Sequence, residues 1–403
     1  MAYIWPMTES YWQIKGGAKS TPREIPDVCL KCDIAIIGAG LTGIAIAHYL
    51  RKAGCENIIV LEKEYVGYGA SGKNAGFLLA GLAEPYSRLK IGMGAESARE
   101  LMNATVENHN LITEAIKENR IDCEYQRSGS YHLAVTEVER KEYDDTVDSL
   151  NRDGFKVEPV DYPIRTPAGR LKGYLGGYFN PADGCLDPFA FVRGLSRKVK
   201  VIESFPVEKI EKSNGIVKIT GTKGAIKSEM AIIATNGYTP LLDRFFERLI
   251  FPLRGQMMAT SALENDVLGK AIYYVNFGYD YFRQSLDNKL LIGGFRNRYL
   301  KEETGSIDAV NIALQNDLAR YVRENLEVAR FGVESRWSGL MAGTIDGLPI
   351  VGALPYNSSV IACAGFNGHG FGLGMTVARE LASAILKGER SHILGRFSIR
   401  RFL

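Results

Sequence analysis

Short apolar runs rich in β-branched residues recur along this chain of 403 residues and predict buried parallel strands. The runs are DIAII at 33–37, NIIVL at 57–61, AIIAT at 231–235 and VIACAGF at 360–366. Runs that are apolar throughout suit strands that are covered on both faces. The region 273–294 alternates instead between apolar and polar positions, as antiparallel strands do. The pattern therefore predicts two kinds of sheet in one chain.

Three glycines follow the first of these runs at a spacing typical of dinucleotide binding. Gly38, Gly40 and Gly43 form GxGxxG, a helical pattern comes next, and the following strand ends in Glu62. The first glycine turns the chain, the second lets the backbone approach a pyrophosphate, and the third lets the helix pack closely on the strand. The N-terminus of that helix offers N–H groups to phosphates, and Glu62 is placed to accept hydrogen bonds from a ribose. We expect an adenine dinucleotide here, and this motif by itself leaves FAD and NAD open.

A second glycine-rich stretch, KEYVGYGASGKNAGF, lies at 63–77 and mixes glycines with Ser71, Lys73 and Asn74. Closely spaced glycines bring backbone N–H groups near a flat ligand, and small polar side chains can satisfy that ligand. The alternative is a flexible surface loop.

Composition and charge narrow the possible partners. The chain exceeds the roughly 250–300 residues that one hydrophobic core supports, so we expect two domains. The 49 Lys and Arg nearly balance the 46 Asp and Glu, which argues against nucleic acid as a partner. No apolar run reaches the length of about 18 residues that a membrane span needs, and the first thirty residues lack the pattern of a secretory signal. We therefore expect a cytoplasmic protein without a membrane span.

Cys29 and Cys32 form a lone CxxC at the entry to the first strand. Without a second pair or nearby histidines this is a weak metal signal, and buried cysteines usually act as small hydrophobic residues. We expect no metal.

Several motifs resemble the FAD-dependent D-amino acid oxidase superfamily, whose members include glycine oxidase, sarcosine oxidase, D-amino acid dehydrogenases and gamma-glutamylputrescine oxidoreductase. GAGLTG, the acid at 62 and GASGKNAG are similar to the family's N-terminal FAD signature. Further similar segments are PADGCLDP at 181–188, FPVEKIE at 205–211, AIIATNGYTP at 231–240, PLRGQMM at 252–258, YFRQSLDNKLLIGG at 281–294, RWSGLMAGTIDGLPIVG at 336–352 and AGFNGHGFGLG at 364–374.

The resemblance implies an interleaved architecture of the α/β and α+β classes. A Rossmann-like FAD-binding domain would consist of residues 1–88, 180–250 and 330–403. A substrate domain built on a mixed, largely antiparallel sheet would consist of 89–179 and 251–329.

The resemblance also implies a set of FAD-binding residues. They are Gly38, Gly40, Leu41, Thr42, Gly43, Glu62, Lys63, Ala70, Ser71, Asn74, Ala75, Gly76, Val207, Thr235, Asn236, Gly237, Gly343, Gly368, His369, Gly370, Phe371 and Gly372. A helix expected at 373–386 would direct its N-terminus at the flavin and stabilise the negative charge of the reduced ring. Because Gly339 stands where related sarcosine oxidases carry a linking cysteine, we expect non-covalent FAD.

The reaction implied by the resemblance is hydride transfer from the carbon beside an amine to flavin N5, giving an imine that hydrolyses to a carbonyl product. Glycine oxidase and D-amino acid oxidases place a carboxylate-binding arginine where this chain has Met341, and a thioether cannot replace it. Two explanations stay open: the substrate lacks a carboxylate beside the amine, or another cation takes over. The candidate cations are Lys73, Arg254, Arg283 and Arg336.

Tyr281 and His369 are further candidates for contact with the substrate. Alternation in YYVNFGYDYF, at 273–282, would put Tyr273, Phe277, Tyr279 and Tyr281 on one face, where rings could surround an alkylammonium; the alternative is ordinary sheet core. Tyr281 is the residue we expect to face the substrate. His369 could act as a base, although the similar motif uses the backbone at this position to hold the flavin.

The sequence thus favours an FAD-dependent enzyme that oxidises an amine or amino acid and passes electrons to O2 or to a redox partner. Secondary or terminal amines are favoured over simple D-amino acids as its substrate. Three alternatives remain: the flavin-bearing subunit of a hetero-oligomeric dehydrogenase, a D-amino acid or glycine oxidase with a relocated carboxylate clamp, and a protein that holds FAD without turnover.

Overall fold

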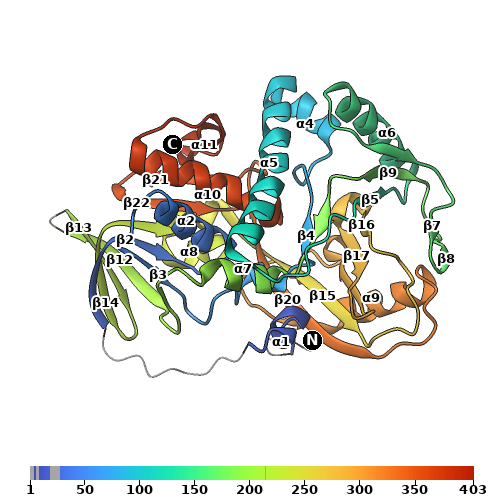
Figure 1. The fold of residues 1–403 in the computed structure, drawn as a ribbon, viewed down its shortest axis with the longest axis horizontal. Coiled ribbons are helices and arrows are strands. Elements are labelled where there is room, and N and C mark those ends of the chain that lie inside the picture. Colours follow the sequence, from blue (N-terminus) through green and yellow to red (C-terminus); the bar gives the residue numbers. More distant parts are fainter. Residues whose placement is uncertain (1–3, 6–8, 19–27, 214) are drawn as a thin grey trace.

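Two eight-stranded sheets lie beside each other in the computed structural model, which describes residues 4–5, 9–18, 28–213 and 215–403 (Figure 1). The first sheet occupies the left half of Figure 1, together with the helices α2 (Leu41–Lys52) and α10 (Gly370–Lys387). Most of the second sheet occupies the right half, and its long strands β15 (Ile250–Thr260) and β20 (Val333–Thr344) run through the middle.

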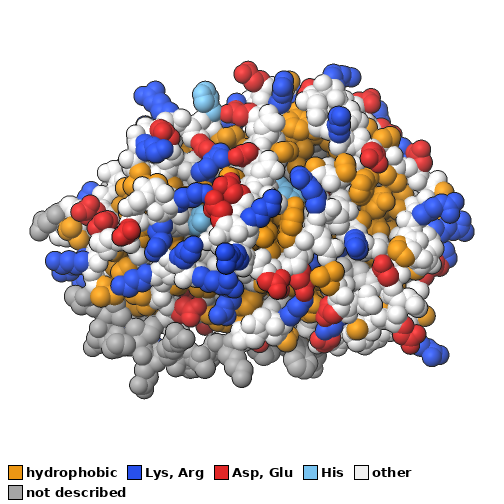
Figure 2. All heavy atoms as spheres, viewed as in Figure 1, with side chains coloured by type: hydrophobic (Ala, Val, Ile, Leu, Met, Phe, Trp, Pro, Cys, Tyr) orange, Lys and Arg blue, Asp and Glu red, His pale blue; other side chains and the backbone are white. Residues whose placement is uncertain are grey.

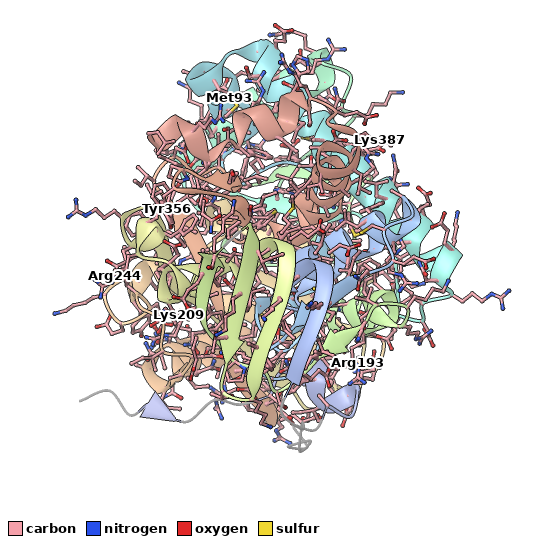
Figure 3. The ribbon with its side chains drawn as sticks, turned by 90° about the vertical axis from the view of Figure 1, so that its left-hand side faces the viewer. Met93, Arg193, Lys209, Arg244, Tyr356 and Lys387 are labelled. Atoms are coloured by element: carbon pink, nitrogen blue, oxygen red, sulfur yellow. The ribbon has the colours of Figure 1, made fainter. Side chains whose placement is uncertain are left out.

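The first sheet has a parallel centre. Its parallel strands, in spatial order, are β11 (Val201–Ile202), β3 (Ile58–Leu61), β2 (Val28–Ile37), β14 (Gly224–Ile233) and β22 (Asn357–Ala364). The antiparallel additions are β21 (Ile350–Leu354) on β22 and the hairpin of β12 (Val207–Ser213) and β13 (Ile216–Gly221) on β14. Figure 3 looks onto this sheet and marks β12 by Lys209. All four apolar runs are strands of this sheet, so their prediction is confirmed.

Both faces of the first sheet are covered, which is why its strands read as continuous apolar runs. Ile36 packs in one cluster with Ile44 of α2 and Val377 of α10. Ile37 points to the opposite face and joins Ile219 of β13. α5 (Ala95–Asn119) and α7 (Pro188–Ser196) complete the helical layer on the first face. The helix expected at 373–386 is confirmed, and α10 begins three residues earlier and ends before Gly388, which has φ 68°.

The second sheet is mixed and largely antiparallel, as expected. Its strand order is β20, β15, β18 (Leu290–Gly294), β17 (Asp280–Gln284), β16 (Ile272–Val275), β5 (Ser130–Leu133), β9 (Gly177–Asn180) and β6 (Glu158–Val160). Within it β16 and β5 are parallel, and the other neighbouring pairs are antiparallel. Leu314 and Leu318 of α9 (Ile312–Glu324) pack with Phe282 against one face of this sheet.

The remaining elements are short or lie at the margins of the sheets. They are the helices α1 (Tyr11–Lys15), α3 (Ala70–Lys73), α4 (Tyr86–Met93), α6 (Glu137–Arg152), α8 (Thr239–Leu242) and α11 (His392–Arg396), the 3-10 turns η1 (Asn236–Tyr238), η2 (Arg244–Arg248), η3 (Asn276–Gly278), η4 (Arg296–Arg298) and η5 (Ile399–Phe402), and the strand pairs β1 (Ile4–Trp5) with β19 (Val310–Asn311), β4 (Phe77–Leu78) with β10 (Gly184–Cys185) and β7 (Arg165–Thr166) with β8 (Gly169–Arg170).

In two places the layers divide the chain differently from the expected domain boundaries. β20 lies in the second sheet, paired with β15 along its length, although 330–403 was assigned to the FAD-binding domain. Ile112 of α5 lies in the core of the first sheet, although 89–179 was assigned to the substrate domain. Residues 1–3, 6–8 and 19–27 of the expected first segment lie outside the described residues. The interleaved division remains a prediction. In the structure β20 belongs to the second sheet and α5 packs on the first sheet.

Among the described residues, no helix combines the length and apolar character that a membrane span requires. Basic and acidic side chains are interspersed over the face shown in Figure 2, in keeping with the near balance of charge in the sequence.

Candidate active site

A cavity of about 660 Å³ extends from the first sheet to the second. Its wall combines the turn after β2, the end of β3, the glycine-rich loop 67–77, the N-terminus of α10 and the inner face of β15, β16, β17 and β20. The volume is in the range that cofactor and ligand sites usually have. Segments from both ends of the chain therefore meet at one site.

Most of the expected site residues line this cavity. Those on its wall are Gly38, Gly40, Leu41, Thr42, Glu62, Lys63, Ala70, Ser71, Lys73, Asn74, Ala75, Val207, Thr235, Asn236, Tyr281, Gly368, His369, Gly370, Phe371 and Gly372.

The turn between β2 and α2 forms the nucleotide end. Gly38 has φ 103°, and a Cβ there would lie 2.7 Å from the carbonyl oxygen of Ala234, so glycine is required for the close approach. α2 begins after Gly40, which has no side chain to cap the helix, and the N–H of Leu41 donates instead to Oγ of Ser71 at 2.8 Å. Such an end suits a pyrophosphate.

Glu62 closes the nucleotide end from β3. Its carboxylate accepts hydrogen bonds from the backbone N–H of Ala39 at 2.8 Å and of Glu64 at 3.1 Å. Burial raises the pKa of Glu62, and the two N–H donors oppose that rise. A buried carboxylate at this strand end is placed to receive the hydroxyls of a ribose.

α10 forms the opposite end of the cofactor site with its own uncapped N-terminus. Asn367 has φ 51° and accepts a hydrogen bond from Thr344 N–H at 2.9 Å, which holds the turn before the helix. A Cβ on Gly372 would lie 2.9 Å from the carbonyl oxygen of Leu79, so the helix can pack closely on that loop. The residues of this turn line the cavity, and a helix N-terminus at this place suits the electron-rich edge of a flavin.

His369 lies in the cavity wall with Nδ1 3.1 Å from the carbonyl oxygen of Asn367. Burial lowers the pKa of His369, and the charge of Arg296 lowers it further. The imidazole is therefore neutral at physiological pH, with one nitrogen occupied by the backbone.

The aromatic strands of the second sheet form the other wall. Tyr274 of β16 pairs with Tyr281 of β17, and both line the cavity. Tyr273 pairs with Phe282 and packs on the far side with Leu314, so its expected place on the cavity face was wrong. The physical reason is the turn η3, which interrupts the alternation with Phe277 at φ 50°. Phe277 and Tyr279 do line the cavity, beside Tyr281.

Burial raises the pKa of Tyr281 to about 12, and the charge of Arg296 opposes that rise. The hydroxyl thus stays protonated and can donate a hydrogen bond into the cavity. An ideal Cβ on Gly255 would lie 3.6 Å from this hydroxyl and 3.2 Å from Cε of Met341, which brings Tyr281 and Met341 to the same part of the wall.

Two of the candidate cations lie behind the wall. Arg254 is buried and pairs through Nε with Glu303 at 3.2 Å, and its Nη1 donates to the carbonyl oxygen of Ile307. Arg283 lies over the ring of Trp12 at 5.1 Å and donates to the carbonyl oxygen of Leu186 at 3.4 Å. Neither residue lines the cavity. Because both side chains lie outside the cavity, the structure does not support either of them as a substrate-binding cation. The sequence alone could not reveal their distant partners.

Lys73 does line the cavity, but its charge is already paired. Its Nζ lies 2.6 Å from Asp308, and both side chains are almost fully buried. The hydroxyl of Ser338 donates to the other oxygen of Asp308.

Four expected cofactor glycines also lie behind the wall, and each serves packing instead. An ideal Cβ on Gly43 would lie 2.0 Å from the carbonyl oxygen of Gly38, and one on Gly76 would lie 2.2 Å from that of Leu186. An ideal Cβ on Gly237 would lie 2.6 Å from the carbonyl oxygen of Met341, and one on Gly343 would lie 3.1 Å from Cδ1 of Leu253.

Arg296, like Tyr274, is one of the pocket residues that the sequence analysis missed. It follows β18 directly after Phe295, which has φ 60°, and it lines the cavity with Nη1 4.0 Å from Sδ of Met341. The signal in the sequence was weak: an arginine just beyond a strand usually points to solvent, and only the left-handed residue before it turns this one inward.

The site fits FAD in several independent respects. Its glycine turn excludes a Cβ, the N-cap residues of α2 and α10 make no capping side-chain bond, and a buried acid stands at the ribose position. Among the described residues, no cysteine lines the cavity and no group of three metal-ligating side chains exists. Non-covalent attachment remains a prediction.

Comparison with known proteins gives a family match over most of the chain. Residues 33–384 match the model of a family described as FAD dependent oxidoreductase. The chain is 28% identical over 375 residues to the probable oxidoreductase OrdL of Haemophilus influenzae, covering 88% of this chain and 83% of that protein. It is 27% identical over 402 residues to gamma-glutamylputrescine oxidoreductase of Escherichia coli, covering 95% and 89%.

The fold is also similar to that of solved structures. Glycine oxidase from Geobacillus kaustophilus superposes with a TM-score of 0.76 at 22% identity, over 93% of this chain and all of that chain.

Proposed function

Because this chain belongs to the FAD dependent oxidoreductase family, and is an FAD-dependent enzyme of the kind that acts on amino acids or amines, we propose that it oxidises a carbon–nitrogen bond at the cavity between its two sheets. FAD, when bound, accepts the hydride that leaves the carbon beside the amine. The amine loses a proton, and water hydrolyses the resulting imine to a carbonyl compound and ammonia or a smaller amine. The two electrons leave to O2 or to a redox partner.

The residues of the chain then have distinct tasks. The turns at Gly38 and at Gly368 would hold the two ends of FAD, with Glu62 at the ribose. Tyr274 and Tyr281 would confine the substrate against the flavin and exclude water from the reacting carbon. His369, held neutral by burial and fixed in place by its bond to the carbonyl oxygen of Asn367, would orient the flavin ring rather than carry a charge.

One observation carries this proposal. The same cavity is lined by the dinucleotide turn and by the aromatic strands of the second sheet, so a cofactor and a small substrate would meet inside it. The relatives support an amine or amino acid as that substrate, since their names include gamma-glutamylputrescine oxidoreductase and glycine oxidase.

Anaerobic titration of the purified flavoprotein tests the proposal. Bleaching of the oxidised-flavin band at about 450 nm is expected with at least one member of a panel of glycine, sarcosine, proline, D-amino acids, gamma-glutamylputrescine and simple amines. If no member bleaches a flavin that dithionite reduces normally, C–N oxidation of these classes is wrong and the protein holds FAD for another purpose.

A further inference from the structure

The cavity contains a cation beside Met341. Met341 is the position at which the resemblance places the carboxylate-binding arginine of glycine oxidase and D-amino acid oxidases. Arg296 reaches this point from the end of β18, with Nη1 4.0 Å from Sδ of Met341 and its guanidinium carbon 5.3 Å from the ring centre of Tyr279. Met341 also lies against Gly368, since an ideal Cβ there would be 3.4 Å from the sulfur. Arg296 therefore stands between the aromatic wall and the turn that precedes α10.

The other cations of the cavity are engaged or lie elsewhere. Lys73 pairs with Asp308, and Arg88 pairs with Glu142 at 2.8 Å. Lys63 adjoins Glu62 and stacks over Tyr238 at 4.0 Å, at the nucleotide end. Within the described part of the chain, no carboxylate lies within ion-pair distance of Arg296. Its charge acts on the cavity instead. Burial raises the pKa of Tyr281 and of Tyr274, and the charge of Arg296 opposes that rise. Burial lowers the pKa of His369, and the charge of Arg296 lowers it further.

We propose that Arg296 anchors a carboxylate of the substrate, so that the enzyme acts on an amine that carries a carboxylate and not on a plain polyamine. A half-buried guanidinium without a counter-ion offers a fork of N–H donors that matches a carboxylate. The protonated hydroxyl of Tyr281, close to Met341, is placed to donate to the same group. Met341 suits this arrangement, since an arginine at its position would place a second positive charge near Arg296.

This inference rests on the proposed function, but its first test needs no turnover. Propionate and propionamide have nearly the same shape and differ in charge, and their binding to the FAD-loaded protein can be followed through the flavin absorption spectrum. We expect propionate to bind at least about tenfold more tightly than propionamide, and R296Q to remove that preference, since one desolvated charge pair is worth such a factor or more. R296K should keep part of it, because lysine retains the charge but not the fork.

Arg298 supplies a matched control. It belongs to the same turn, is exposed, and stacks over Phe295 at 4.0 Å outside the cavity. R298Q should retain the preference for propionate. Equal binding of the two probes to the unaltered protein, or a preference that survives R296Q, would overturn the assignment.

Turnover provides the second readout. With any carboxylate-bearing substrate that bleaches the flavin, R296Q should raise KM by roughly 100-fold and change kcat much less, because the anchor acts in the ground state and the transition state alike. If no amine bleaches the flavin, the proposed function fails while the propionate result still decides the role of Arg296. If plain amines alone bleach it, the carboxylate anchor is wrong and the enzyme class stands.

An independent observation concerns α1, near the N-terminus of the chain. Its side chains bind backbone carbonyls of the glycine-rich loop: Ser10 Oγ donates to Gly72 at 2.5 Å, Trp12 Nε1 donates to Asn74 at 2.8 Å, and Gln13 Nε2 donates to Tyr68 at 2.9 Å and to Gly67 at 3.3 Å. Ser10, Trp12 and Gln13 are all fully buried. A capping box between Ser10 and Gln13 fixes the helix itself.

The loop that α1 binds is a wall of the cofactor site. Tyr68, Ser71 and Asn74 of this loop line the cavity. On the opposite side of the loop, α1 donates hydrogen bonds to the backbone carbonyls of Tyr68 and Asn74. A loop with this many glycines has little stiffness of its own. We also propose that α1 positions this loop for FAD, with Gln13 as the central positioning residue.

Release of FAD from the holoenzyme tests this second proposal. Q13E is isosteric, but it replaces the donating amide by oxygen opposite two carbonyls, so we expect FAD to be released about tenfold faster or more, as flavin fluorescence after dilution would show. The flavin absorption band should also change shape, which a uniform loss of stability would not cause. S10A removes the bond to Gly72 and the cap on Gln13 N–H without burying a charge, and it serves if Q13E does not fold.

Tyr11 is the control on the same helix, because its hydroxyl donates to Asp287 in the turn between β17 and β18 and not to the loop. Y11F should leave the release rate within about twofold, since it deletes a hydrogen bond of similar worth elsewhere. Q13E and Y11F with the same release rate and the same spectrum would show that α1 has no special hold on the flavin loop.

Discussion

At the scale of single residues, the buried pair of Lys73 and Asp308 makes a sharp prediction about stability. K73M would leave the carboxylate of Asp308 buried with only the hydroxyl of Ser338, and such an unpaired charge costs about 3–5 kcal/mol. The double variant K73M/D308N removes both charges, so it should recover much of the loss. Urea unfolding of the FAD-loaded proteins measures both. Equal destabilisation in the single and double variants would contradict the prediction.

The same residues show what sequence can and cannot predict at this scale. Glu62 and Gly38 could be placed because their roles follow from local order along one strand, one turn and one helix. Arg254 and Arg296 could not, because a cation's role depends on its partner. The partner of Arg254, Glu303, is 49 residues away. Arg296 borders the cavity because the left-handed Phe295 turns the chain after β18, and a β-strand pattern does not announce such a turn.

At the scale of elements, the turn between β16 and β17 sets which aromatic rings face the substrate. Gly278 has φ 78°, and an ideal Cβ there would lie 1.9 Å from the ring of Tyr274. G278A should therefore push Tyr274 into the cavity, raising KM for substrate severalfold while FAD stays bound. Steady-state kinetics and the flavin content measure the two effects. Gly269, with φ 73° and no atom closer than 3.5 Å to an ideal Cβ, carries the same backbone strain without the clash, so G269A should leave KM unchanged.

This turn also explains where element prediction stopped. Strand existence was predictable from period, both for the buried parallel runs and for the alternating region that became β16, β17 and β18. The face on which each ring lies was not predictable, because the three-residue turn η3 interrupts the alternation. As a result Tyr274, and not Tyr273, shares the cavity face with Tyr281. β20 and α5 show the same limit for whole elements, since the layer they join is decided by long-range pairing and packing.

At the scale of the whole molecule, α5 links stability to pH through a histidine buried between layers. His109 is 5% exposed, its Nε2 lies 2.9 Å from the hydroxyl of Tyr125, and burial lowers its pKa to about 4, helped by the charge of Arg127. In the unfolded chain its pKa returns to about 6.5, so between these values the unfolded state binds more protons. The free energy of unfolding should therefore fall as pH drops from 6.5 towards 4, by roughly 2–3 kcal/mol from this residue.

H109Q removes that proton uptake and keeps a polar group for Tyr125, so its stability should fall less steeply with acid than that of the unaltered protein. Urea unfolding midpoints at several values across this pH window give the two slopes. His392 is exposed at the start of α11, and H392Q is the control, because this side chain stays in solvent on folding and should not change the slope. His369 adds in the same direction, since burial lowers its pKa as well, so some acid sensitivity should persist in H109Q. A slope that H109Q and H392Q alter equally would show that the acid response arises from the carboxylates of the surface and not from this buried imidazole.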